Sequence, residues 1–302
     1  MFTNLSGLST ESRHPASEHL DEMATASLVE LFHAADREAM DAVQLVLPQI
    51  ATAIDTISAR MAEGGRLFYC GAGTSGRLGV LDASECPPTY NTPPEMVQGV
   101  IAGGDVALRI SVEGAEDHPE LGGDDLIARG FAAKDTLVGI AASGRTPYVL
   151  GAMEYARSIG AFTVGLSCVA DSPVARAAQL AITPVTGPEV VTGSTRMKAG
   201  TATKLVLNML STGVMVRLGY VYGNLMVNVQ PTNEKLRDRA VRIVATLTGL
   251  DADAAAKLLD EAGSVRVAVV MHRLALDRDA ATARLEAVRG SLRGALRSAE
   301  GK

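Results

Sequence analysis

The sequence predicts an α/β fold in which a parallel sheet of about five strands is flanked by helices, with N-terminal helices before it and a small all-helical tail after it. Short apolar runs alternate with helical stretches over about 120 residues, a pattern typical of βαβ units. The runs are apolar at nearly every position, as expected for strands covered on both faces. They are 66–70, 96–102, 136–142, 162–168 and 180–185.

Helices are expected both before and after the predicted strands in the sequence. Residues 26–61 carry apolar side chains at helical spacing and predict one or two amphipathic helices, with a break near Pro48. A long helix rich in Ala, Leu and Met is expected at 194–218, and a further helix begins near Thr232. Residues 251–299 show three short helical patterns and no strand, which indicates a small helical appendage.

The chain of 302 residues is long enough for one large domain, or for one domain with an appendage. The changes of pattern predict an N-terminal helical arm at 1–50, an α/β domain at 51–248 and a small helical C-terminal domain at 249–302. The first helices and the apolar helix at 194–218 carry more hydrophobic surface than one sheet layer needs, which favours a homodimer.

The composition argues against several classes of protein. Apolar residues make up 47% of the chain and charged residues of both signs 21%, which is typical of a globular domain. The net charge of −6, the scattered Lys and Arg and the lack of Trp argue against nucleic acid as a partner. No apolar run reaches membrane-spanning length and the N-terminus does not resemble a signal peptide, so we expect no membrane partner and a cytoplasmic location.

The three cysteines, Cys70, Cys86 and Cys168, lie far apart and form no CxxC pair, so a zinc site is not indicated. Their odd number suggests free thiols in a reducing compartment. The sequence also lacks an HxxxH pattern and a carboxylate-rich D-x-D pattern. We therefore expect neither a metal nor another cofactor.

A glycine-rich turn, 71-GAGTSGR-77, follows the first predicted strand and opens a helix. Thr74 and Ser75 add hydroxyls to the free N–H groups of that helix start, which together suit an anion. The spacing formally matches GxGxxG, but no acidic residue ends the next strand to hold a ribose, and the GK[ST] ending of a P-loop is missing. Taken alone, the glycines are equally compatible with a simple tight turn.

Two further segments repeat this construction. The turn 143-SGRT-146 follows the third predicted strand, and 192-TGSTR-196 is expected to open the long helix. In a parallel sheet the turns after the first and third strands lie at the carboxyl edge, where ligands of open α/β sheets bind. Three hydroxyl-rich helix starts suit a small phosphorylated compound better than a large nucleotide.

Acidic residues lie close to these turns in the sequence. Glu85 is expected just beyond the helix that follows the first turn, stiffened by Pro87 and Pro88, and Glu113 and Glu116 follow the second predicted strand. A carboxylate near a helix end is most often solvated or a cap. The alternative is an acid–base pair of carboxylates flanking a bound sugar phosphate.

The motifs taken together resemble the N-acetylmuramic acid 6-phosphate etherase family, which has the three-layer SIS fold of phosphosugar-binding proteins. The resemblance extends from 10-TESR-13 to the helical tail, although His14 stands where the family pattern has Asn. It implies that 51–248 is an SIS catalytic domain. The related glucokinase regulatory proteins share several motifs but have two SIS domains. The segments that carry the resemblance are 68–90, 112–117, 140–149, 187–212 and 232–236.

The resemblance implies a carbon–oxygen lyase of cell-wall recycling, which removes D-lactate from the 3-position of N-acetylmuramic acid 6-phosphate by elimination and then adds water. By the family match, Glu116 is the base and Glu85 the proton donor, while Glu113 stays open from the sequence alone. A non-catalytic sugar-phosphate sensor would have lost these acids, and the ASECPP and EGAED runs point away from an aldose–ketose isomerase. The residues expected to bind the substrate are Thr74, Ser75, Ser143, Gly144, Arg145, Thr146, Ser194, Thr195 and Lys235.

Overall fold

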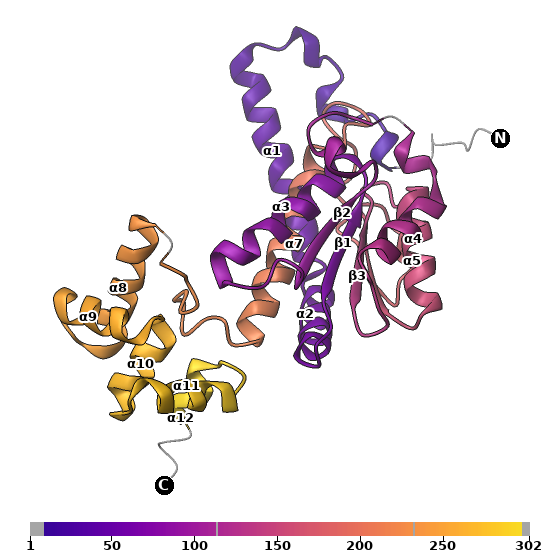
Figure 1. The fold of residues 1–302 in the computed structure, drawn as a ribbon. Coiled ribbons are helices and arrows are strands. Elements are labelled where there is room, and N and C mark those ends of the chain that lie inside the picture. The colour runs from indigo at the N-terminus through magenta and orange to yellow at the C-terminus, as the bar shows by residue number, and fades with distance from the viewer. Residues whose placement is uncertain (1–8, 113, 232, 298–302) are drawn as a thin grey trace. The chain divides into compact units, whose positions relative to one another are not determined.

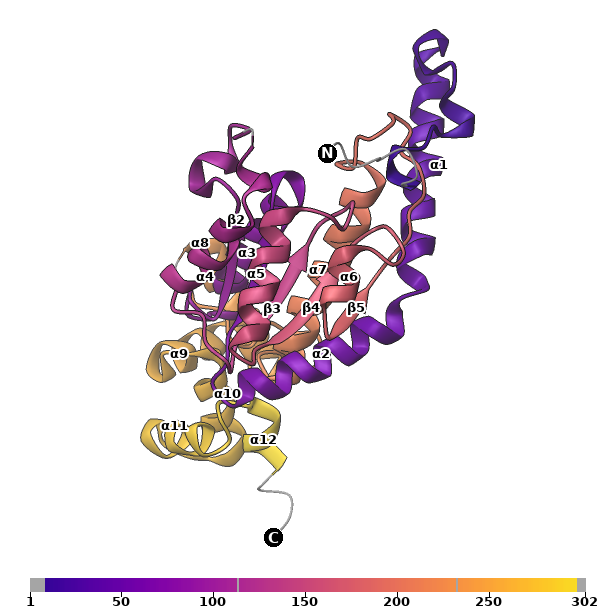
Figure 2. The ribbon, with the colours of Figure 1, turned by 90° about the vertical axis from the view of Figure 1, so that its right-hand side faces the viewer.

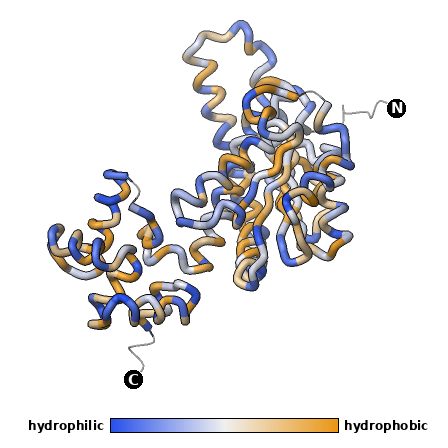
Figure 3. Tube along the Cα trace, viewed as in Figure 1, coloured by the Kyte–Doolittle hydropathy of each residue, from blue (hydrophilic) through white to orange (hydrophobic). Residues whose placement is uncertain are grey.

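The computed structural model describes residues 9–112, 114–231 and 233–297 (Figure 1). Within these residues the chain forms a sheet of five strands in the order β2-β1-β3-β4-β5, and every neighbouring pair is parallel. The predicted parallel sheet is therefore confirmed, and the tube in Figure 3 is coloured as hydrophobic along it. The strands are β1 (Leu67–Gly71), β2 (Val97–Ile101), β3 (Thr136–Ile140), β4 (Phe162–Leu166) and β5 (Leu180–Ile182).

The order of the strands reverses between β1 and β3. The chain passes from β1 outwards to β2 and then returns to the other side of β1 to form β3. Gly71, the last residue of β1, pairs in register with Ile101 of β2 and with Ile140 of β3. All three strands thus end at one level, and the loops after β1 and β3 leave at the switch point where open α/β sheets bind ligands.

Helices cover both faces of the sheet and make the three layers that the resemblance implies. On one face α4 (Pro119–Ala128), α5 (Pro147–Ser158) and α6 (Pro173–Ala177) enclose an apolar core. Figure 2 shows these helices together along that face. On the other face α3 (Gly73–Tyr90) packs against Tyr69 through Gly79, and it contacts α7 (Lys198–Arg217) through hydrogen bonds from Asn208 and Ser211 to Asp82.

The predicted N-terminal helices are confirmed as α1 (Thr25–Gln44) and α2 (Leu47–Ala62). The break falls where it was expected, and Pro48 occupies the first turn of α2, where a missing N–H costs no helical hydrogen bond. Among the described residues no single helix is long and apolar enough to cross a membrane; α1 and α2 meet that criterion only when taken together across a bend of 59°.

The chain divides into two compact units, residues 1–84 with 95–211 and residues 85–94 with 212–302. The second unit starts well before the expected domain boundary at 249, because α8 (Glu234–Thr248) shares its apolar core with the helices after it. Within 251–297 the structure has four helices where three patterns were expected, since a left-handed residue, Ala275, ends α10 early. These helices are α9 (Ala252–Ala262), α10 (Val265–Leu274), α11 (Arg278–Ala287) and α12 (Leu292–Arg297).

Candidate active site

The turn between β1 and α3 is as tight as its glycines suggest. A Cβ atom on Gly71 would lie 2.7 Å from the backbone nitrogen of Gly76, so a side chain there would collide with the first turn of α3. Gly73 has φ +52°, and a Cβ there would meet no described atom within 4 Å. Thr74 and Ser75 follow in the first turn of α3 and are half-buried. Their hydroxyls and the N–H groups of this helix start stay the predicted ligands of an anion.

The turn between β3 and α5 is packed against the loop that follows β4. Gly144 has φ +70°, and a Cβ atom there would lie 2.2 Å from the Cβ of Ser172. The N–H of Gly144 donates to the carbonyl of Ala141 at 2.8 Å, so this group closes the turn itself. Thr146 precedes α5, and its hydroxyl makes no capping hydrogen bond to the described first turn of that helix. This hydroxyl, Ser143 and Arg145 stay predicted ligands.

These two turns leave the sheet side by side. The strands β1 and β3 are neighbours, and Gly71 pairs in register with Ile140, so both turns begin at the same level of the carboxyl edge. The starts of α3 and α5 therefore share the switch point of the sheet. This is the arrangement that the sequence predicted for a small phosphorylated ligand.

The third hydroxyl-rich segment does not open a helix. The expectation that α7 starts at Ser194 is wrong, because the helix begins at Lys198. Gly193 is left-handed, and the N–H of Thr195 donates back to its carbonyl at 2.9 Å, which turns the chain before the helix can form. The loop lies near the first turn, since a Cβ atom on Gly200 would be 3.8 Å from Cγ2 of Thr74 and 3.6 Å from the carbonyl of Thr195.

The N-terminus of α7 is already occupied by a carboxylate of this chain. Glu189 is completely buried and accepts the N–H of Lys198 at 2.9 Å and the N–H of Ala199 at 3.0 Å. These are two of the N–H groups that a helix start leaves without helical partners. The positive end of α7 is therefore satisfied internally, and a phosphate is expected at the starts of α3 and α5 instead. Sequence reasoning missed Glu189, whose only signal is one acid within the apolar, glycine-flanked run 187-GPEVVTG-193.

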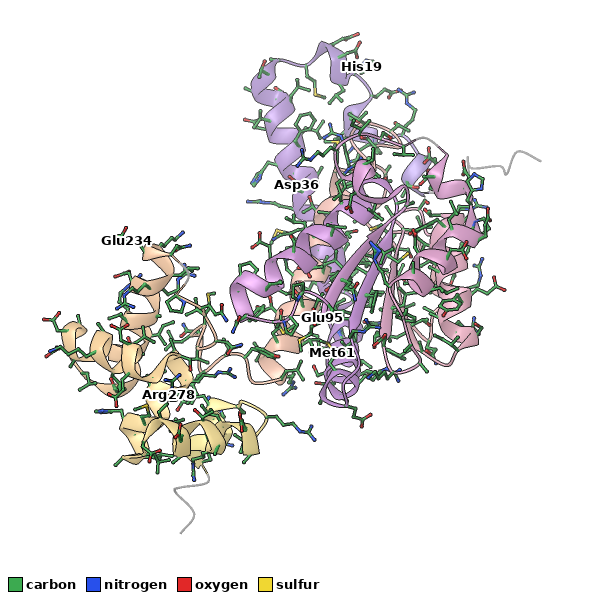
Figure 4. The ribbon with its side chains drawn as sticks, in the orientation of Figure 1. His19, Asp36, Met61, Glu95, Glu234 and Arg278 are labelled. Atoms are coloured by element: carbon green, nitrogen blue, oxygen red, sulfur yellow. The ribbon has the colours of Figure 1, made fainter. Side chains whose placement is uncertain are left out.

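The start of α7 is also tied to the N-terminal helix α1. Lys198 is 1% exposed, and its Nζ atom donates to Oε2 of Glu38 at 2.6 Å. His14 places Nε2 at 3.9 Å from Oε1 of the same carboxylate. One turn away, the hydroxyl of Thr201 lies 3.4 Å from Oδ1 of Asp36, which Figure 4 labels on α1. The charged groups of the N-terminal arm thus hold the helix that follows Ser194 and Thr195.

Glu116 lies in a short 3₁₀ turn, η5 (Ala115–Asp117), between β2 and α4. Ala115 packs against the apolar core, and η5 lies against α5, the helix that opens at the second turn. The side chain of Glu116 is exposed. Glu113, the other acid left open by the sequence, lies outside the described residues. The structure therefore places Glu116 in the same unit as both turns, on a loop at the carboxyl side of the sheet.

Glu85 lies inside α3 and not beyond its end as expected from the two prolines. The helix continues through Pro87 and Pro88 to Tyr90, although prolines cannot donate helical hydrogen bonds to the carbonyls four residues before them. Burial of Cys86 and Tyr90 anchors this last turn, and the N–H of Asn91 donates to Pro87 at 2.8 Å. The exposed Glu85 belongs to the second unit, as does the exposed Lys235 in the first turn of α8.

Known proteins resemble this chain over nearly its whole length. An N-acetylmuramic acid 6-phosphate etherase of Serratia proteamaculans is 55% identical over 294 residues, which cover 97% of this chain and 99% of the relative. One of Clostridium beijerinckii is 50% identical over 300 residues, with 99% of each chain covered. The chain belongs to the N-acetylmuramic acid 6-phosphate etherase family.

Two other comparisons concern the sheet domain of this etherase-family chain. The family model of the glucokinase regulatory protein N-terminal SIS domain matches residues 49–157, a span that contains both glycine turns, Glu85 and Glu116. A phosphoheptose isomerase from Francisella tularensis has a TM-score of 0.48 and 17% identity, and the match covers 64% of this chain and 98% of that one. Within the described residues, no group of three or more His, Cys, Asp or Glu side chains is arranged to hold a metal ion.

Replacing Glu189 with alanine is expected to destabilise this etherase-family fold by about 2–5 kcal/mol, because two buried N–H groups would lose their acceptor. Glu189→Gln keeps one acceptor oxygen and should lose less. Urea unfolding followed by circular dichroism measures both variants. Glu18→Ala, at an exposed acid of the N-terminal arm, serves as the control and should stay within about 0.5 kcal/mol of wild type. An unchanged midpoint for Glu189→Ala would contradict the capping role.

Cys70 and Cys168 are expected to resist alkylation in the folded protein. Burial raises the pKa of Cys70 well above its usual value and raises the pKa of Cys168 to about 12. At about pH 8 roughly one Cys168 thiol in 10⁴ would be the reactive thiolate. Mass spectrometry after iodoacetamide treatment should show modification of both at least about 100-fold more slowly than in urea-unfolded protein. Rapid modification of native Cys168 would contradict this burial.

Proposed function

We propose that this chain is a carbon–oxygen lyase that cleaves the D-lactyl ether of N-acetylmuramic acid 6-phosphate. The products are N-acetylglucosamine 6-phosphate and D-lactate, and the reaction belongs to peptidoglycan recycling. The observation that carries the proposal is the identity of 50–55% to etherases over almost the whole chain. The site supports it, since two hydroxyl-bearing helix starts lie side by side at the switch point of the sheet.

The two turns are proposed to bind the 6-phosphate. Ser75 of α3 and Thr146 before α5 offer hydroxyls at neighbouring strand ends, and both helix starts direct a positive dipole end towards this edge. Glu189 fills the start of α7, so the loop of Ser194 and Thr195 is proposed to contact the sugar and not the phosphate. Binding the phosphate in this way orients the open-chain sugar for reaction at C2 and C3.

Glu116 is proposed to be the base of the elimination. In the open-chain form C1 is an aldehyde, and the adjacent C2–H is acidic enough for a carboxylate to remove. The electron pair of that bond first forms an enolate with the C1 aldehyde. As the C3–O bond then breaks, the aldehyde forms again and the pair becomes the C2–C3 double bond. Glu85 is proposed to protonate the departing lactate oxygen, because an ether oxygen is otherwise a poor leaving group. Water then adds at C3, and C2 regains a proton. These reaction steps need no cofactor.

The chain is further proposed to act as a cytoplasmic homodimer. Its three cysteines are buried free thiols, which fits a reducing compartment. Large apolar side chains are exposed on and beside α1, including Val29, Met40 and Leu45, and such a surface favours burial against a second copy. Light scattering coupled to size-exclusion chromatography distinguishes a dimer from a monomer of 31.4 kDa.

The proposed function is tested with the wild-type protein and N-acetylmuramic acid 6-phosphate in deuterated water. The expected result is release of D-lactate together with N-acetylglucosamine 6-phosphate that carries deuterium at C2. Enzymatic assay of D-lactate and proton NMR of the sugar measure the two products. Binding of the substrate without release of lactate would contradict the lyase and favour a sugar-phosphate sensor.

A further inference from the structure

Helices α4 and α5 connect the proposed base with the second phosphate turn. Glu116 comes three residues before Pro119, the first residue of α4, and Thr146 comes directly before Pro147, the first residue of α5. Figures 1 and 2 both show the two helices side by side, and η5 lies against α5 as well. The way in which α4 packs on α5 therefore sets the position of Glu116 relative to Thr146.

The two helices touch through their backbones at two glycines. A Cβ atom on Gly151 of α5 would lie 1.8 Å from the carbonyl oxygen of Pro119, and one on Gly122 of α4 would lie 2.0 Å from the carbonyl oxygen of Tyr148. Both glycines lie inside helices, where glycine costs about 1 kcal/mol relative to alanine. Neither has a left-handed backbone, so the lack of a side chain serves the close approach.

A part-buried hydrogen bond joins the same two helices beside the glycines. Tyr148 is 0% exposed, and its hydroxyl donates to Oδ2 of Asp125 on α4 at 2.5 Å. Burial raises the pKa of Tyr148, with the neighbouring Cys70 and Asp125 acting in the same direction, so the phenol keeps its proton and stays a donor. The bond opposes rotation and sliding of α4 along α5.

We propose that Gly122, Gly151 and the Tyr148–Asp125 hydrogen bond, together called the α4–α5 seam, position Glu116 for removal of the C2 proton. The seam holds the start of α4 at backbone contact with α5, while the start of α5 carries the phosphate turn. The distance from bound phosphate to base is thereby fixed by two rigid helices. The inference rests on the proposed function for the role of Glu116 as base.

The test is the substitution Gly151→Ala, with Gly123→Ala as its matched control. The new Cβ at Gly151 must push away the carbonyl of Pro119, which displaces Glu116 by about 1 Å, and such a misplacement costs up to about 100-fold in rate. At Gly123 the new Cβ would lie 3.4 Å from Cβ of Tyr155, an ordinary contact. Both substitutions put alanine for glycine in one of the paired helices, so a general effect on helix stability is shared.

We expect Gly151→Ala to lower kcat for D-lactate release and the rate of C2 proton exchange by roughly 10- to 100-fold. KM and the dissociation constant of N-acetylglucosamine 6-phosphate should stay within about threefold, because the phosphate turns are unchanged. Gly123→Ala should keep all these values within about twofold. A folded Gly151→Ala variant that matches Gly123→Ala in kcat, or that changes KM alone, would overturn the proposal.

A second variant covers the case in which Gly151→Ala does not fold. Tyr148→Phe keeps the ring and removes only the bond to Asp125, and kcat should fall by about 3- to 10-fold with KM unchanged. An unaltered kcat would overturn the proposal that the seam positions Glu116. If the wild type itself releases no lactate, the proposed function fails separately. Crystal structures of the wild type and Gly151→Ala then test whether the seam sets the position of Glu116. Glu116 should shift relative to Thr146 in Gly151→Ala, and an unshifted Glu116 would overturn the proposal.

Discussion

Replacing Glu116 with glutamine is expected to lower the rate of D-lactate release by roughly 10²- to 10⁴-fold and to abolish deuterium incorporation at C2. Glutamine has nearly the same shape as glutamate but cannot accept the C2 proton. Elimination cannot begin without that step, so both readouts should fall together. Binding of N-acetylglucosamine 6-phosphate should change by less than about threefold, since the phosphate turns are untouched.

The neighbouring acid Asp117 is the matched control for this experiment. It is exposed and lies in the same 3₁₀ turn, so Asp117→Asn removes one negative charge from the loop without touching the proposed base. Its activity should stay within about threefold of wild type. If Glu116→Gln kept proton exchange, the base would lie elsewhere. Glu113→Gln would then be the next variant to measure, because the sequence alone does not separate these two acids.

Replacing Glu85 with glutamine is expected to separate D-lactate release from exchange of the C2 proton. Lactate release should fall by roughly 10²- to 10⁴-fold, because the ether oxygen would leave without a proton. Exchange of the C2 proton should continue, since Glu116 still removes and returns it. Glu95→Gln, at an exposed acid that Figure 4 labels, is the control for loss of a carboxylate.

A change of leaving group sharpens this second experiment. A substrate analogue with a more acidic group in place of lactate at C3 needs less protonation as that group departs. Glu85→Gln should therefore recover much of the wild-type rate with the analogue, whereas Glu116→Gln should not. Loss of C2 exchange in Glu85→Gln, or a failure of the analogue to restore its rate, would contradict the role of Glu85 as proton donor.

The sheet could be predicted almost completely from the sequence. Each strand of a parallel sheet is buried on both faces, so its sequence is apolar at nearly every position. Surface segments do not have such continuous apolar runs. The helices were harder to delimit. The path of α3 through Pro87 and Pro88 and the late start of α7 both contradict local propensity, and both depend on tertiary anchors: Tyr90, which is buried, and Glu189, which caps α7.

The candidate site could be predicted only where its residues follow strand ends in the chain. Both glycine turns have that signature, and Glu85 and Glu116 are predicted from their motifs. Glu189 and Lys198 have no such signal, because Glu189 binds the first N–H groups of α7 and Lys198 pairs with Glu38 on α1. Gly122 and Gly151 look in the sequence like residues that weaken a helix. Only the packing of α4 on α5 shows that the two helices touch there.

The division of the chain has a consequence for its synthesis on the ribosome. Residues 85–94 belong to the second unit, yet the rest of that unit begins only at Thr212. Within it the side-chain amide of Asn228 donates to the carbonyl of Tyr90, so this bond forms only after residue 228 has been made. The first unit has its whole sequence by residue 211, including both turns and Glu116. The segment of Glu85 is therefore made before the first unit is complete, but its partners in the second unit are made only afterwards. Folding from the N-terminus onwards thus leaves this segment without those partners while the first unit folds.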